Sequence, residues 1–203
     1  MIRLEKDGGL WIATIDRPEK ANSLTEEMLS ELTDIAEAAQ DARVLVLTGA
    51  GKVFSAGADL EAARAGLALS PVWERLSGAL TALPCLTIAA LNGTVAGGAM
   101  GMVLACDLRI AVPGSKAFYP VMKLGFLPQP SDPPRMAQLV GPARAKMIFM
   151  GGAKTDTETA LSWGLFDRIV EKDALMSEVR SLSEDTLNAT PDHAAAIKAM
   201  IRT

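Results

Sequence analysis

The sequence predicts an α/β fold whose strands are mostly parallel. Segments with the apolar pattern of strands alternate along the chain with segments that show helical spacing. Residues 43–48 form a continuous apolar run that ends at a glycine, which is typical of a strand buried on both faces. The chain has 203 residues, of which 49% are hydrophobic, so it is long enough for one domain with a proper core.

The first half of the chain is expected to open with a hairpin and a helix. Residues 3–5 and 10–16 have strand character and are joined by the turn sequence Asp7-Gly-Gly. Thr25 is a suitable N-cap, and apolar residues follow it at helical spacing. The elements expected next are a strand at 43–48, a loop at 49–57, a helix that starts near Asp59, a helix at 70–83 and a strand at 86–91.

The second half is expected to contain a proline-rich loop followed by helices. Five prolines lie between Tyr119 and Arg135, which predicts a loop there. The other expected elements are helices at 97–105, 133–140, 142–150 and 156–163, strands at 108–112 and 166–170, and closing helices. A composition shift near Gly151 predicts a core over residues 1–150 and a short helical region over 151–203.

Composition and charge exclude several classes of protein. The net charge is −4 with no block of like charge, and aromatics make up 4%, so we expect no nucleic-acid partner. Residues 76–106 carry no charge, but Pro84 and several glycines interrupt them, which favours a buried interior over a membrane span. Cys85 and Cys106 lie in apolar runs, and the first residues lack the apolar core of a secretory signal. We therefore expect a cytoplasmic protein.

The candidate functional segments are two glycine-rich loops, the first at residues 49–57 and the second ending at Gly97 and Gly98. The first loop resembles two known motifs, and it fits neither. GAGKVF at residues 49–54 lacks the third glycine of a dinucleotide fingerprint, and VFSAG at 53–57 lacks the first glycine of a nucleophile elbow. The preferred interpretation is an oxyanion hole, in which backbone N–H groups stabilise a developing negative charge. Gly98 stands at an expected helix start, and residues 55–58 could offer a second N–H. The alternative is that these glycines only serve tight turns and close packing.

Several segments together resemble the crotonase, or enoyl-CoA hydratase/isomerase, superfamily. The resemblance runs from about Leu10 to the end of the chain. Its segments are RPEKANSL at 17–24, FSAGADL at 54–60, IAALNG at 88–93 with Gly97-Gly98, LACDLRIA at 104–111, LVGPARA at 139–145 and ALSWGL at 160–165. The resemblance implies repeated ββα turns wound into a superhelix. It also implies a coenzyme A thioester as ligand, with no cofactor apart from the coenzyme A of the substrate and with no metal.

The resemblance also assigns roles to residues of the two loops. The thioester oxygen would accept hydrogen bonds from the amides of Ala58 and Gly98. The segment that contains Ala56, Asp59 and Leu60 would line the adenine and pantetheine path. Lys20 would contact a phosphate, and Asp59 also reads as a helix N-cap.

The usual carboxylates of the family are missing. The two glutamates of its hydratases would fall at Gly101 and Val121, which cannot move a proton. We therefore expect these two positions to border the substrate, with Gly101 widening an apolar pocket. Asp132 is the best candidate for a relocated acid/base, and the alternative is a solvated loop aspartate that shapes the turn. Tyr119 could donate a hydrogen bond to substrate, but a strand-end residue half in the core is the simpler interpretation.

Three hypotheses about function follow. The first is an enzyme that stabilises the enolate of an acyl-CoA thioester, for which isomerisation, decarboxylation or thioester cleavage fits better than two-glutamate hydration. The second is an acyl-CoA-binding protein that has lost catalysis, and an NAD-dependent enzyme is a distant third. Family members usually continue through further helices that cover the pocket and build a trimer. The sequence therefore reads as a C-terminally shortened member, for which a homotrimer or hexamer is possible.

Overall fold

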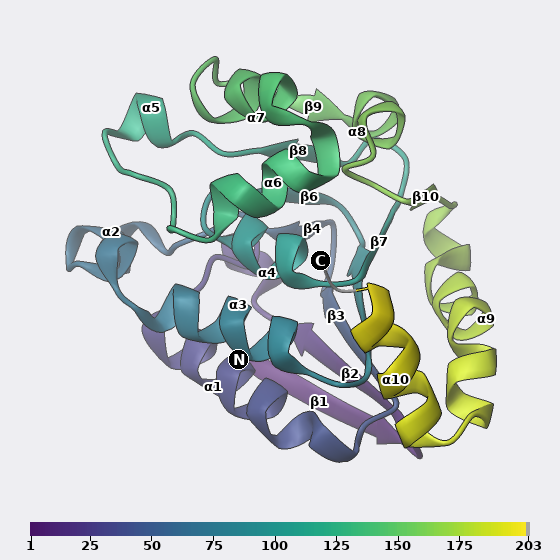
Figure 1. Cartoon of the computed structure of the whole chain (residues 1–203). Helices are drawn as coiled ribbons and strands as arrows, with labels where there is room; N and C mark the ends of the chain where they lie inside the picture. Colours follow the sequence, from purple (N-terminus) through teal and green to yellow (C-terminus); the bar gives the residue numbers. More distant parts are fainter. Residues whose placement is uncertain (202–203) are drawn as a thin grey trace.

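The protein is built on two sheets between which the strands alternate along the chain. The structure is a computed structural model that describes residues 1–201. The larger sheet has the strand order β1-β2-β3-β5-β7-β10 and the smaller the order β4-β6-β8-β9 (Figure 1). The larger sheet contains β1 (Ile2–Asp7), β2 (Leu10–Ile15), β3 (Val44–Gly49), β5 (Leu86–Leu91), β7 (Leu108–Ala111) and β10 (Arg168–Ile169). The smaller sheet contains β4 (Val53–Ser55), β6 (Thr94–Ala96), β8 (Lys116–Phe118) and β9 (Thr155–Asp156).

Each pass of the chain places one strand in each sheet before a helix follows. Strands β3 and β4 precede α2 (Leu60–Arg64), β5 and β6 precede α4 (Ala99–Ala105), and β7 and β8 precede α5 (Val121–Leu124). All strand pairs are parallel except β1 with β2 and β8 with β9. The predicted α/β class with mostly parallel strands and repeated ββα turns is therefore confirmed.

Helices cover both faces of the larger sheet. On one face lie α1 (Glu26–Ala38), α3 (Val72–Ala82) and α4, and on the other lies α9 (Leu175–Asn188). Along β3, Leu45 and Leu47 join the core under α1 and α3, whereas Val44 and Val46 join the core under α9. Side chains alternate between the faces of a strand, so an uninterrupted apolar run is what this position requires.

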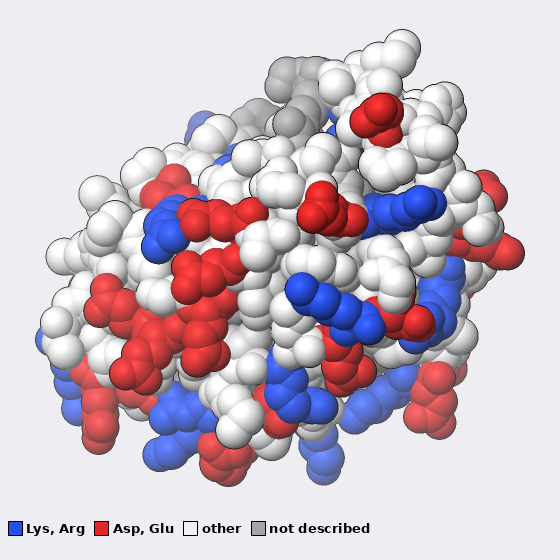
Figure 2. Space-filling view, turned by 90° about the horizontal axis from the view of Figure 1, so that it is seen from below, with Lys and Arg blue, Asp and Glu red and all other residues white. Residues whose placement is uncertain are grey.

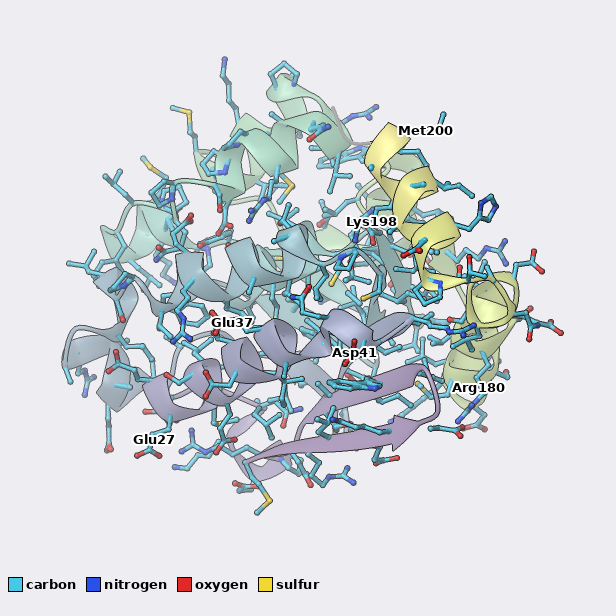
Figure 3. The ribbon with its side chains drawn as sticks, turned by 60° about the horizontal axis from the view of Figure 1, so that its bottom comes forward. Glu27, Glu37, Asp41, Arg180, Lys198 and Met200 are labelled. Atoms are coloured by element: carbon cyan, nitrogen blue, oxygen red, sulfur yellow. The ribbon has the colours of Figure 1, made fainter. Side chains whose placement is uncertain are left out.

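The remaining helices lie at one end and one side of the sheets. Figure 1 shows α6 (Asp132–Val140), α7 (Pro142–Phe149) and α8 (Thr157–Trp163) above the smaller sheet, with α6 against α4. The last helix, α10 (Pro191–Ile201), has no buried residue. Figure 3 shows Lys198 of α10 directed toward the body of the molecule and Met200 directed away from it. The split at residues 150 and 151 stays a prediction, although β9 and β10 pair with strands of the first part.

The structure corrects the predicted loops in two places. Strand β4 lies inside the expected loop 49–57, and β6 and β8 were not predicted at all. Each has three residues, which is too short for an alternating pattern to show. The proline-rich segment is not one loop, because α5 begins directly after Pro120 and α6 begins at Asp132, with Pro133 and Pro134 in its first turn. Proline is accepted in a first helical turn because the N–H it lacks would have no partner there.

The uncharged segment 76–106 is an interior segment. It contains the end of α3 followed by β5, β6 and α4, and every residue of α4 is buried. Within residues 1–201, no helix is long and apolar enough to cross a membrane. Cys85 and Cys106 are free and buried, and burial raises the pKa of Cys106 to about 12. The face shown in Figure 2 carries both acidic and basic side chains, and the acidic ones gather on one side of it.

Candidate active site

The two glycine loops lie against each other, backbone to backbone. Gly57 follows β4 and has a φ of +90°, and a Cβ there would lie 2.8 Å from the carbonyl oxygen of Ala96 at the end of β6. The Cα atom of Gly97 would be 3.4 Å from the same point. Only a glycine allows so close an approach, and the positive φ also favours glycine. The pairing of β4 with β6 therefore brings the amides at 58 and 98 into the same region.

In the described chain, the N–H groups of Ala58 and Gly98 donate no hydrogen bond, whereas the neighbouring N–H groups do. Within residues 1–201, neither has a protein acceptor. The neighbouring amides are bonded: Ala56 N–H to the carbonyl of Ala21, Gly57 N–H to Oγ of Ser55, Asp59 N–H to the carbonyl of Leu24, and Gly97 N–H to the carbonyl of Phe118. Buried amides are nearly always paired, so two unpaired amides in adjacent loops suit an external acceptor.

Both free amides border one apolar cavity of about 160 Å³. Its wall also includes Trp73, Tyr119, Val121 and Gln129. The Trp73 ring packs on Gly98, where a Cβ would lie 3.1 Å from ring atoms, and its Nε1–H donates to the carbonyl of Leu67 at 2.8 Å. A ring held in this way excludes water from one side of the Gly98 amide. Sequence reasoning missed Trp73, because no motif marks a tryptophan in the first turn of a helix.

A second hollow of about 660 Å³ lies on the other side of the first loop. It shares Ala56, Ala58 and Leu60 with the apolar cavity, so the two are adjacent across these residues. The side chain of Lys20 lines this hollow, is exposed and has no partner within residues 1–201. Such a group suits a solvated anion at the hollow.

Asp59 has the structural role that its motif indicates. Its carboxylate caps α2 by accepting hydrogen bonds from the amides of Glu61 at 3.0 Å and Ala62 at 3.3 Å. It also accepts one from Arg17 at 2.9 Å. The Ala62 amide, followed by the Arg17 guanidinium, holds the pKa of Asp59 below its usual value. The predicted N-cap is therefore confirmed, and the carboxylate also borders the second hollow.

Asp132 is fully buried, which contradicts the alternative of a solvated loop aspartate. It is the first residue of α6, and its Oδ2 accepts a hydrogen bond from the Tyr119 hydroxyl at 2.9 Å. Its Oδ1 has no partner within the described chain. Burial raises the pKa of Asp132 to about 6, against a smaller lowering by the Tyr119 hydroxyl. Tyr119 is buried rather than half in the core, and its ring lies 5.1 Å from that of Phe149.

The carboxylate of Asp132 fills the space that the missing side chain at 101 leaves open. A Cβ at Gly101 would lie 2.9 Å from Oδ1 of Asp132 and 3.2 Å from Oδ2. Gly101 is buried and is not among the residues that border the cavity, and its place beside a substrate stays a prediction. Gly101 makes room for a carboxylate. Val121 does border the cavity, as expected.

Two further polar side chains, those of Ser55 and His193, lie outside the cavity. Ser55 is fully buried, and its hydroxyl donates to the carbonyl of Asn22, so it is not poised as a nucleophile. His193 lies on α10 and borders a separate hollow of about 670 Å³. That hollow lies where β5 and β7 begin, and an ion pair of Lys198 with Asp107 at 2.6 Å borders it. The two glycine loops follow the carboxyl ends of β4 and β6, and the carboxyl ends of parallel strands are where ligands usually bind.

Comparisons with known proteins agree with this geometry. The family model for enoyl-CoA hydratase/isomerase matches residues 5–203. A carnitinyl-CoA dehydratase from Citrobacter koseri is 33% identical over 99% of this chain and 80% of its own length. The solved structure of an enoyl-CoA hydratase/isomerase from Pseudoalteromonas atlantica has a TM-score of 0.91 at 27% identity, covering 98% of this chain and 82% of that one. An enoyl-CoA hydratase/carnithine racemase from Magnetospirillum magneticum has a TM-score of 0.90 at 27% identity, covering 98% and 79%.

The fold and the paired loops therefore define a protein of the crotonase type. The chain belongs to the enoyl-CoA hydratase/isomerase family.

Proposed function

We propose that this protein is an enzyme that binds an acyl-CoA thioester and stabilises its enolate between the amides of Ala58 and Gly98. The observation that carries the proposal is that these two N–H groups have no protein acceptor in the described chain and border the same cavity. The thioester oxygen becomes negative when the α-carbon loses a proton. Fixed donors in a site shielded from water stabilise that charge by about 3–4 kcal/mol for each well-placed donor.

The rest of the ligand follows from the two hollows. The coenzyme A portion occupies the hollow beside Arg17 and Lys20, where these cations stabilise its phosphates. The thioester lies at Ala56 to Leu60, which both hollows share, and the acyl group enters the apolar cavity toward Val121. No other cofactor and no metal takes part in this proposal.

Asp132 is proposed as the carboxyl group of the site in place of the two glutamates at 101 and 121. It is the only buried carboxylic acid in the described chain, and it stands where the side chain of residue 101 would begin. One carboxyl group suits double-bond isomerisation, which returns to the acyl chain the same proton that it removes. Dehydration, the reaction named for the Citrobacter koseri relative, is the second reaction to assay.

The test is a turnover screen with matched thioesters. The protein is incubated with butyryl-, 2-butenoyl-, 3-butenoyl- and malonyl-CoA, and products are followed by absorbance and mass spectrometry. We expect conversion of the 3-enoyl to the 2-enoyl thioester. Tight binding of all four thioesters without any product would contradict the enzyme and support an acyl-CoA-binding protein, which the bare positions Gly101 and Val121 favour.

A Gly98→Ala variant tests the oxyanion hole itself. The added methyl group would lie 3.1 Å from the Trp73 ring, so either the ring or the amide must shift. Loss of one oxyanion donor costs about 10²–10³ in kcat. The matched control is Gly78→Ala in α3, where the new methyl group would meet nothing within 4 Å and activity should be unchanged. Full activity of Gly98→Ala would argue against this placement of the thioester oxygen.

A further inference from the structure

Tyr119 lies between the apolar cavity and the buried carboxyl group of Asp132. Tyr119 borders the cavity, whereas Asp132 is 0% exposed and is not part of the cavity wall. The Tyr119 hydroxyl donates to Oδ2 of Asp132 at 2.9 Å. Tyr119 is therefore the residue that links the wall of the cavity to the carboxyl group of Asp132.

Within residues 1–201, the hydrogen bond from Tyr119 is the only one that the carboxyl group of Asp132 receives. The nearby charges belong to Glu74 of α3 and Arg135 of α6, and they raise and lower its pKa respectively. Both are bonded to Ser131 instead: Glu74 Oε1 accepts from its hydroxyl at 2.9 Å, and Arg135 donates to that hydroxyl at 2.9 Å. Within residues 1–201 neither forms an ion pair with Asp132.

Such an arrangement is costly for the fold. A buried carboxyl group without a charged partner is disfavoured when it ionises, and a buried oxygen without a hydrogen bond costs about 1–3 kcal/mol. Gly101 adds a further cost, because glycine inside a helix is less stable than alanine by up to about 1 kcal/mol. Costly ionisable groups beside a cavity are concentrated at functional sites.

We infer that Tyr119 is a further catalytic residue, which passes protons between the bound acyl group and Asp132. The inference rests on the proposed function. When the α C–H bond breaks, its electrons move into the enolate, whose oxygen lies between the amides of Ala58 and Gly98. The proton bonds to the Tyr119 oxygen, while the proton already on that oxygen moves to Oδ2 of Asp132. The reverse transfer delivers a proton to the γ-carbon, which completes a 1,3 shift with no other reactant.

This relay needs a phenol that stays neutral and a carboxyl group that can both hold and release a proton close to neutral pH. Burial also raises the pKa of Tyr119, so the phenol stays neutral before and after each transfer. Asp132, with a pKa of about 6, holds a proton or gives it up close to neutral pH, which is where a general acid/base is most effective. A phenol oxygen has two lone pairs and can therefore accept one proton while it donates another.

The experiment is α-proton exchange of butyryl-CoA in deuterated water, measured by mass spectrometry alongside the affinity for the same thioester. The variants are Tyr119→Phe, Asp132→Asn and the double variant. Removing a general acid/base lowers a rate by about 10²–10⁴-fold, so we expect a loss of this size in each single variant. The double variant should lose no more, because the two groups act in series. The dissociation constant for butyryl-CoA should stay close to that of the wild type.

The pH profile separates a proton relay from a structural hydrogen bond. Exchange by the wild type should rise as the pH passes through about 6, where Asp132 ionises, and this rise should be absent from Asp132→Asn. A control for buried hydroxyl loss is Thr155→Val, which removes a hydrogen bond of 2.8 Å to the carbonyl of Ala117 in β8. That variant should exchange as fast as the wild type.

The outcomes distinguish the relay from the function on which it rests. Exchange at the wild-type rate in Tyr119→Phe would overturn the relay and leave the proposed function intact. If the wild-type protein binds butyryl-CoA but exchanges no proton, both the relay and the proposed enzymatic function are overturned. Should Tyr119→Phe fail to fold, as judged by circular dichroism, Asp132→Asn with its altered pH profile remains a sufficient test.

Discussion

At the residue scale, the most informative pair in the molecule is Gly101 with Asp132. By the family resemblance, the hydratases carry a glutamate at the position of Gly101 on α4. In this protein the carboxyl group of Asp132 on α6 occupies the space beside that position. The carboxyl group of Asp132 is fully buried in this position and is therefore not solvated. The pair can therefore be probed through stability as well as through activity.

The stability of the fold should fall with rising pH because of Asp132. Its pKa is 3.8 in an unfolded chain and about 6 in the folded protein, so folding favours the protonated form. Below pH about 3.8 both states hold the proton and there is no penalty. As the pH rises through about 6, the folded state loses stability, by up to about 3 kcal/mol in total.

Replacing Asp132 with asparagine should remove this penalty. We expect Asp132→Asn to be more stable than the wild type by about 1 kcal/mol near pH 4.5 and about 3 kcal/mol near pH 7.5. Urea unfolding at both pH values measures the difference, and comparison with the wild type cancels the contribution of all other acids. A difference that does not change with pH would show that Asp132 has an ordinary pKa.

A double-mutant cycle tests the contact between the two positions. Gly101→Ala alone should destabilise the protein, because the new methyl group would lie 2.9 Å from Oδ1 of Asp132. In an Asp132→Ala background the same change should stabilise it by up to about 1 kcal/mol, which is the usual gain from alanine over glycine in a helix. Thermal unfolding of the four proteins measures both effects. Equal effects in the two backgrounds would argue against the contact.

At the element scale, the sequence indicates the long strands and most helices well, because their apolar patterns repeat often enough to be recognised. Strand β3 and helix α1 are examples, and the Thr25 cap was predicted from its residue type and is present. The three-residue strands of the smaller sheet were missed because three residues show no period, although β4 and β6 position both glycine loops.

The candidate site shows the same division. Ala58 and Gly98 could be chosen from motifs that occupy contiguous residues, and both lie at the cavity. The hydrogen bond of Tyr119 to Asp132 joins residues that are 13 positions apart, with the proline-rich segment between them. No local sequence pattern predicts such a contact. The contact of Trp73 with Gly98 likewise depends on how α3 packs against α4.

The segment before α1 should make a separable contribution to ligand binding through Lys20. The free ammonium group of Lys20 borders the hollow proposed for coenzyme A, so Lys20→Ala should weaken binding of butyryl-CoA by about 1 kcal/mol. Binding of the butyryl thioester of N-acetylcysteamine, which lacks the phosphates, should not change. Lys146→Ala on α7, another exposed lysine, is the control. Isothermal titration calorimetry measures the affinity of the wild type and of both variants for the two thioesters. An equal loss of affinity for the two thioesters in Lys20→Ala would exclude a phosphate contact.

At the scale of the whole molecule, α10 lies on the surface and has few described ties to the rest. It has no buried residue, and Lys198 connects it to β5 and β7 through the carbonyl of Cys85 at 2.7 Å and the carboxylate of Asp107. Ile197, Met200 and Ile201 are exposed. The homotrimer or hexamer expected from the family stays a prediction, and light scattering of the purified protein measures it. A monomer at all concentrations would contradict it.

The close approach of Gly57 to Ala96 has a consequence for when the proposed site can form during folding. The N–H groups of Ala58 and Gly98 come from separate ββα turns. Both turns must therefore be folded and packed together before the two N–H groups lie at the same cavity. Under the proposed function, a partly folded chain with native helices would be inert, and recovery of turnover after dilution from urea should lag behind recovery of the helical circular dichroism signal.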